Sequence, residues 1–137
     1  MRPADFDAAV ISEFRARGGR VGGSLAHTPL LLLGTTGVRT GRPRTTPLAY
    51  RREADRLYVI ASAGGAAAHP AWYRNLRGHP VATVEVGTKR FEATATVLAG
   101  ADRDRVFAAI VGDSPTAGEY QARTGRTIPV VALDRRR

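Results

Sequence analysis

A β-hairpin in the second half of the chain is the sequence feature that most restricts the fold. Residues 81–86 and 89–98 are rich in Val, Thr and Ala, and only the two-residue turn Gly87-Thr88 separates them. From Phe91 to Val97 every second residue is apolar, which is typical of a strand with one buried face. The segment therefore predicts a pair of antiparallel strands.

The other apolar segments are short and fit a sheet of the same kind. Further strands are expected at residues 30–33, 45–52, 57–61 and 128–133. Helices are expected to begin near Asp5, Pro70, Asp102 and Ser114-Pro115. This order lacks the regular alternation of a doubly wound sheet. It predicts a mainly β, α+β fold in which five or six short strands form a barrel.

The first 28 residues are expected to form an amphipathic helix and a loop. Phe6, Val10 and Phe14 recur every four residues, and Gly18-Gly19 can end the helix. Arginines flank this apolar stripe, which leaves peripheral membrane contact open, although packing on the barrel is the expectation we favour. A chain of 137 residues fits one domain, with the barrel at residues 29–137.

Several classes of protein are excluded by what the chain lacks. It has no cysteine, so disulfides and thiolate chemistry are excluded, and three histidines without H-x-x-x-H spacing predict no metal site. The N-terminus lacks the apolar stretch of a signal peptide, and the longest aliphatic run, Leu30–Leu33, cannot span a bilayer. We therefore expect a cytoplasmic protein.

The first segment that suggests chemistry is an arginine-rich loop between two expected strands. The net charge is +9, and Lys89 is the only lysine, so nearly all of the basic charge is arginine. Residues 35–46 hold Arg39, Arg42 and Arg44 together with glycines and threonines. Guanidinium groups, hydroxyls and inward-pointing amides suit an anion. The spacing matches neither a Walker loop nor a dinucleotide fingerprint. The alternative is an exposed polar turn.

A second segment, residues 61–76, suggests a place for a planar ring. A strand ends in Gly64-Gly65, and the next helix carries Trp72, the only tryptophan. A ring could lie against the strand end with the indole as an apolar wall, or Trp72 could belong to the core. We expect His69 to cap the helix that begins near Pro70 or to lie at the surface. Because no catalytic constellation is recognisable, a cofactor would have to carry the reactive atom.

Together these segments resemble the deazaflavin-dependent nitroreductase family, whose members use coenzyme F420, an 8-hydroxy-5-deazaflavin. The matching segments are residues 31–48, 61–65, 69–76 and 120–131. The resemblance implies a split β-barrel of the flavin-reductase type, related to FMN-binding and pyridoxamine-phosphate-oxidase-like barrels, with helices packed around it.

The resemblance also implies a set of site residues. Those expected to bind the phosphate and acidic tail of the coenzyme are Val38, Arg39, Thr40, Gly41, Arg42, Pro43 and Arg44, with Pro47 nearby. Those expected to line the deazaflavin are Ile60, Ala61, Ser62 and Ala63, and those expected to close the pocket are Ala71, Trp72, Tyr73 and Asn75. Candidates for orienting the acceptor or relaying a proton are Ser62, Tyr120 and, less directly, Tyr50.

The implied activity is hydride transfer from the reduced coenzyme to an electron-poor small molecule. Acceptors in the family include nitroaromatics, quinones and the activated double bonds of enones or lactones. Two departures from the family pattern concern binding: Val38 stands where many relatives have a basic residue, and residues 112–120 lack two aromatics before Tyr120. The acceptor class therefore stays open.

Three other functions are weighed against this one. The first is an FMN-dependent oxidoreductase on a related barrel, and the second is a coenzyme-binding or accessory protein without redox turnover. Nucleic-acid binding is disfavoured because no interleaved aromatics or recognised module accompany the arginines. A homodimer is compatible with the fold by analogy alone.

Overall fold

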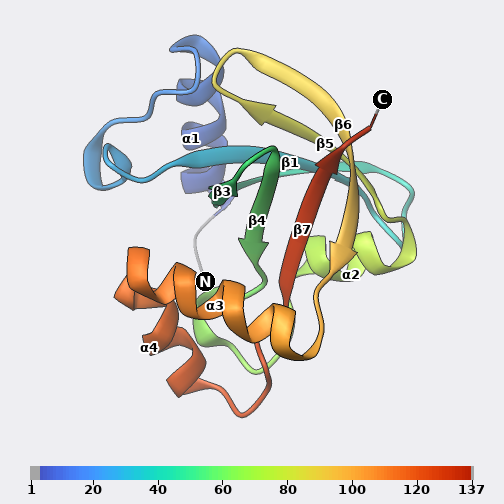
Figure 1. The fold of residues 1–137 in the computed structure, drawn as a ribbon. Coiled ribbons are helices and arrows are strands. Elements are labelled where there is room, and N and C mark those ends of the chain that lie inside the picture. The colour runs from blue at the N-terminus through green and yellow to red at the C-terminus, as the bar shows by residue number, and fades with distance from the viewer. Residues whose placement is uncertain (1–3, 137) are drawn as a thin grey trace.

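The computed structural model describes residues 4–136 (Figure 1). Its helices are α1 (Ala4–Ala16), α2 (Ala71–Gly78), α3 (Gly100–Asp113) and α4 (Pro115–Arg123). Its strands are β1 (Leu30–Thr36), β2 (Pro43–Ala49), β3 (Arg51–Glu53), β4 (Arg56–Ile60), β5 (Val81–Val86), β6 (Lys89–Val97) and β7 (Val130–Arg135). Two 3-10 turns, η1 (Gly23–Leu25) and η2 (Ala63–Gly65), lie in the connections.

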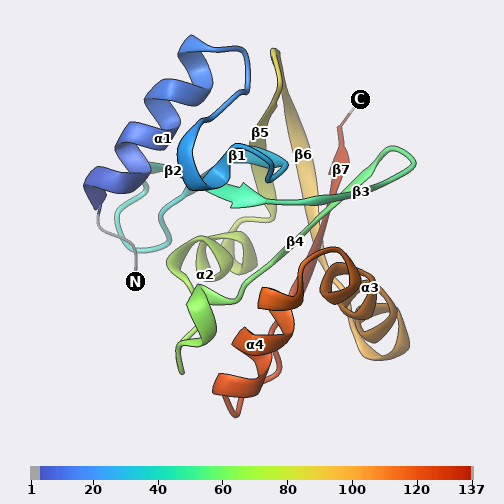
Figure 2. The ribbon, with the colours of Figure 1, turned by 90° about the vertical axis from the view of Figure 1, so that its left-hand side faces the viewer.

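The strands form one antiparallel sheet that curls into a half-barrel. Their order is β2-β1-β5-β6-β7-β4-β3, which puts β2 and β3 at opposite edges. Yet only Tyr50 separates the end of β2 from the start of β3 along the chain. The sheet must therefore curl until its two edges meet, as Figures 1 and 2 show. The predicted mainly β barrel is confirmed.

The number of strands is larger than predicted because one expected strand divides. Residues 45–52 were expected to form a single strand, but β2 ends at Ala49. Tyr50 donates its backbone N–H to the carbonyl of Pro29 (3.2 Å), and the next residues pair with β4 instead of β1. One segment thus serves both edges of the sheet.

The leucine run of β1 is buried on both faces of the sheet. Leu31 and Leu33 point into the barrel interior, where they pack in the main apolar core. Leu30 and Leu32 point outward and are covered by Val10 and Phe14 of α1. A strand covered on both faces reads as a continuous apolar run instead of an alternating one.

The four helices cover different parts of the half-barrel. In Figure 2, α1 lies on one side and α3 and α4 lie on the other, with α2 below the strands. The expected packing of α1 on the barrel is confirmed for Val10 and Phe14, while Phe6 is 38% exposed. None of the helices in the described chain is both long and apolar enough to traverse a bilayer.

Two local expectations need correction. Ser114-Pro115 is typical of a helix cap followed by a first turn, and Pro115 does begin α4, but the Ser114 side chain makes no capping hydrogen bond. Val97 was expected on the buried face of its strand and is 43% exposed, because β6 ends there and the chain turns towards α3.

Candidate functional site

The arginine-rich loop is a compact turn between β1 and β2. The backbone N–H of Gly37 donates to the carbonyl of Arg42 (2.8 Å), and that of Gly41 donates to the carbonyl of Gly37 (2.8 Å). Gly41 has a positive φ of 68°, a conformation that glycine adopts without strain. The side chains of Arg39, Arg42 and Arg44 are exposed around this turn.

The loop does not offer its backbone to an anion in the way the sequence suggested. Besides Gly37 and Gly41, the amide of Val38 donates to Asn75 Oδ1 (3.2 Å), and that of Arg42 donates to Thr40 Oγ1 (3.2 Å). These four amides are engaged inside the protein, which corrects the expectation that successive amides point at the ligand. The three guanidinium groups of this loop remain exposed, and guanidinium groups suit an anion.

Asn75 fixes this loop to helix α2. Its side chain is buried, accepts from the Val38 amide and donates through Nδ2 to Thr35 Oγ1 (3.2 Å). Val38 also packs against Gly78 so closely that a Cβ there would lie 2.6 Å from Val38 Cγ1. The arginine loop and the second half of α2 thus form one unit.

The first half of α2 adjoins the second candidate segment. Ala71 is exposed at the helix start, whereas Trp72 and Tyr73 are buried in the main core with their rings edge to face, 6.3 Å apart. Of the two positions expected for Trp72, a wall for a bound ring or a place in the core, the structure shows the core position. The eight residues of α2 span about 12 Å, with the connection from β4 entering at the start of the helix.

The segment after β4 makes a left-handed turn. Ala63, Gly64 and Gly65 have φ values of 47°, 65° and 85°. Gly65 lies against α4, where a Cβ would be 2.9 Å from the carbonyl oxygen of Tyr120. The structure therefore brings the turn that follows Ser62 next to the helix of Tyr120.

The remaining predicted site residues are divided between two apolar clusters. Ile60 and Tyr120 pack against the outer cluster beneath α3 and α4, while Ala61 and Tyr50 belong to the barrel interior. Pro47 is fully buried in β2. Tyr120 thus lies on the helix that packs against the turn after Ser62, while Tyr50 packs against the interior cluster that holds Ala61.

Sequence reasoning missed Arg126 and misread His69. The guanidinium group of Arg126 contacts His69 Nδ1 (2.9 Å) and three backbone carbonyls of residues 61–66. His69 is half-buried, and Pro70 takes the N-cap position of α2. Burial lowers the pKa of His69, and the positive charges of Arg126, Arg77 and Arg74 lower it further. His69 is therefore a neutral, anchored residue and not a surface cap.

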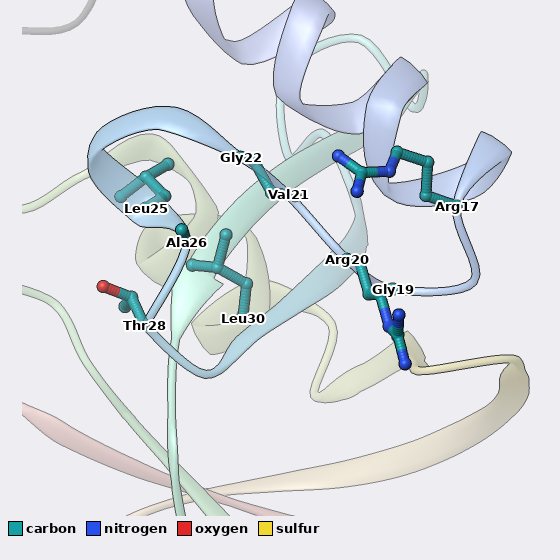
Figure 3. Close-up of a pocket in the computed structure, with 9 residues that line it drawn as sticks. All are labelled: Arg17, Gly19, Arg20, Val21, Gly22, Leu25, Ala26, Thr28 and Leu30. Atoms are coloured by element: carbon teal, nitrogen blue, oxygen red, sulfur yellow. The ribbon is translucent and has the colours of Figure 1, made fainter.

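Two cavities in the described part of the chain do not include the arginine loop. One, of about 370 Å³, lies between the end of α1, the following loop and Leu30 (Figure 3). The other, of about 390 Å³, lies between Tyr73, residues 97–104 and Pro129. Tyr73 is the one predicted site residue that lines either of them.

Comparison with known proteins identifies the family. The model of the F420H2-dependent quinone reductase family matches residues 9–135, nearly the whole chain. The chain belongs to that family. The coenzyme and the reaction class in the family's description are those predicted from the sequence.

Relatives of this quinone reductase family occur in mycobacteria. An F420H2-dependent quinone reductase of Mycobacterium tuberculosis is 41% identical over 127 residues, which is 90% of this chain and 85% of that protein. A second reductase from the same organism, described as putative, is 33% identical over 105 residues, 77% of this chain and 88% of its own length.

Solved structures agree with the family assignment. An F420H2-dependent reductase, FDR-A, superposes with a TM-score of 0.71 at 36% identity, covering 77% of this chain and 94% of its own. A protein solved as a domain-swapped dimer has a TM-score of 0.73 at 32% identity and covers 97% of this chain and 100% of its own. A pyridoxamine-phosphate-oxidase-like protein of Listeria innocua, 13% identical, shares the split-barrel fold.

Proposed function

We propose that this chain binds reduced coenzyme F420 along helix α2 and catalyses hydride transfer from it to a quinone. The observation that carries the proposal is that the arginine loop packs on the second half of α2, while the turn after β4 leads into the start of the same helix. A ligand with a flat ring and an anionic tail suits these two segments. The names of the mycobacterial relatives supply the acceptor class.

The donor set on the loop fits the anionic part of such a coenzyme. Arg39, Arg42 and Arg44 are exposed on one short turn. Each charge-assisted hydrogen bond to a phosphate or carboxylate contributes roughly 1.5–3 kcal/mol. The loop itself is held rigid by Asn75, so little ordering is needed when an anion binds.

The other residues of the proposed site orient the reactants and handle a proton. Ile60, Ala61, Ser62, Ala63 and Ala71 would contact the ring, and the buried Trp72 and Tyr73 would support the wall behind it. The bound coenzyme supplies the hydride. A quinone that accepts a hydride must also take up a proton to become a hydroquinone. The hydroxyl of Ser62 or Tyr120 would hold that proton near the acceptor oxygen.

A direct turnover assay tests this function. The purified protein would be mixed with reduced F420 and a soluble naphthoquinone, and the return of the oxidised deazaflavin absorbance would be followed. Nitroaromatics and enones, which we propose as further acceptors, belong in the same panel. Calorimetry with F420 and with FMN separates the two cofactors. Heat with FMN alone would replace the proposal by the FMN-dependent alternative, and heat with neither would reject both.

We also propose that the chain forms a homodimer. The support is a relative of nearly equal length that was solved as a domain-swapped dimer. Light scattering coupled to size-exclusion chromatography tests the assembly, and a monomer across the micromolar range would reject it.

A further inference from the structure

One guanidinium group holds together the whole connection between β4 and α2. Arg126 Nη2 donates to the carbonyl of Ser62 (2.8 Å), and Nε donates to the carbonyl of Ala66 (2.9 Å). Nη1 donates to the carbonyl of Ala61 (3.1 Å) and lies 2.9 Å from His69 Nδ1. The contacts reach from the end of the strand to the residue before Pro70, where α2 begins.

The geometry also fixes the tautomer of His69. An arginine side chain has donors and no acceptor, so the His69 Nδ1 that faces it must accept. The ring proton then resides on Nε2. All four partners of Arg126 are therefore uncharged acceptors, and the positive charge at the end of β4 is not cancelled by a carboxylate within this set.

Arg126 is itself held in place from α4. Gln121 Nε2 donates to the carbonyl of Arg126 (2.8 Å), and the Arg126 amide donates to Thr124 Oγ1 (3.3 Å). Gln121 Oε1 accepts from the amide of Ile128 (2.9 Å), which fixes the other side of the same loop. The guanidinium group thus projects from a braced backbone.

The segment that Arg126 holds would not keep this shape by itself. Ala63 has a φ of 47°, and two glycines with positive φ follow it. Such a run costs conformational energy at Ala63 and gives the glycines many alternatives in the absence of tertiary contacts. The carbonyls of Ala61, Ser62 and Ala66 are bonded to one rigid, planar group.

We propose that Arg126 is a positioning residue for the coenzyme ring: it acts by holding residues 61–69 in the shape that receives the deazaflavin. This inference rests on the proposed function, in which Ile60 to Ala63 line that ring. Arg126 need not touch the coenzyme. Its loss would let the turn after Ser62 move, so the ring would bind more weakly and in a less reactive orientation.

The test compares Arg126→Ala and Arg126→Lys with Arg56→Ala. Arg56 is the matched control, because it also makes forked bonds from strand β4, to Asp134 of β7 (2.9 Å each), and stabilises the fold away from residues 61–69. Coenzyme binding is followed by calorimetry, and turnover with reduced F420 and a naphthoquinone gives kcat and KM for each substrate. Folded fraction is followed by circular dichroism.

A positioning role and a merely structural role give different results. For Arg126→Ala we expect the Kd and KM for the coenzyme to rise roughly tenfold, because the turn that receives the ring is then no longer held in place. The Kd and KM of Arg126→Lys should lie between those of the wild type and of Arg126→Ala, because an ammonium group lacks the planar fork that bonds several carbonyls. Arg56→Ala should lower Tm and leave the KM for the coenzyme unchanged.

Each other outcome counts against the inference. If Arg126→Ala loses activity only in proportion to its folded fraction, with wild-type KM for the coenzyme, Arg126 is structural and the inference is wrong. If that variant does not fold, a wild-type KM in Arg126→Lys overturns it equally. Failure of the wild-type protein to bind F420 is a separate result: it removes the proposed function, and this inference with it.

Discussion

Asn75 Oδ1 accepts the backbone N–H of Val38 at 3.2 Å, although the two residues are 37 positions apart in the chain. The same amide side chain donates to Thr35 Oγ1 at 3.2 Å. A single buried side chain on α2 therefore fixes, at two points, the segment that leads into the three arginines. The loop depends on α2 for its place in the fold, and the proposed binding of an anion depends on the loop.

Substituting Asn75 should affect stability and coenzyme binding together. In Asn75→Ala the Val38 amide and the Thr35 hydroxyl lose their partners, at a cost of about 1–3 kcal/mol in the free energy of unfolding. The arginine loop is also released, so the Kd for F420 should rise. Thr35→Val is the control, because it removes only the second bond and leaves the Val38 contact intact. Urea unfolding and calorimetry should show both variants destabilised and only Asn75→Ala weakened in binding.

The exposed arginines should contribute a salt-dependent part of the affinity. Arg39→Ala and Arg44→Ala should each weaken F420 binding, and the difference from wild type should be larger at low than at high ionic strength, because salt screens exposed charges. Arg52→Ala removes the same charge from an exposed arginine on β3, which follows the end of β2 that is away from the loop. Fluorescence titrations at two salt concentrations measure these effects. Equal losses in all three variants would show that net charge matters and the loop does not.

Local sequence signals were sufficient for the hairpin but not for the closure of the sheet. The strands on either side of Gly87-Thr88 lie where the alternation put them, because a two-residue turn fixes their register. The break at Tyr50 has no comparable signal. It arises because the sheet closes on itself and the chain must pass from one edge to the other, which depends on all seven strands.

The part of the candidate site that depends on the types of side chain present could be predicted from the sequence. Three arginines and glycines within a dozen residues indicate a loop that suits anions. Arg126 gave no such signal, since three of its four partners are backbone carbonyls 60 to 65 residues away, and every residue has a carbonyl. The sequence also contained no sign that Asn75 and Thr40 accept hydrogen bonds from the amides of the loop, because every residue except proline has an amide.

The turn after β4 should tolerate an added methyl group at one glycine and not at its neighbour. Gly64 and Gly65 both have positive φ, so alanine at either position costs about 1 kcal/mol from backbone strain. A Cβ at Gly64 meets open space, whereas at Gly65 it would lie 2.9 Å from the carbonyl oxygen of Tyr120 and 3.0 Å from Arg123 Cβ. Gly65→Ala should therefore be about 1–3 kcal/mol less stable than Gly64→Ala by urea unfolding. Equal stabilities would contradict the close packing of η2 on α4.

The neutrality of His69 predicts how stability changes below neutral pH. Its pKa is lowered in the folded protein, chiefly by burial, so the unfolded chain takes up a proton first as the pH falls below about 6.5. The free energy of unfolding should therefore decrease with falling pH from 6.5 until the lowered pKa is passed, because the unfolded state binds more protons in that window. His69→Asn retains an acceptor for Arg126 and cannot titrate, so this part of the decrease should be absent. Substitution of the exposed His79 by Asn serves as the control.

Three carboxylates lose their contributions to stability at lower pH than His69 does. They are Glu13, Glu53 and Glu85, whose pKa values are lowered chiefly by hydrogen bonds from the Gly22 amide, Arg105 and Arg15 respectively. The stability that they contribute is lost only below about pH 4.5. Urea unfolding between pH 5 and 8 thus isolates the histidine. If His69→Asn kept the full wild-type slope, the decrease would have to come from a different group, and His69 would not be the neutral partner of Arg126.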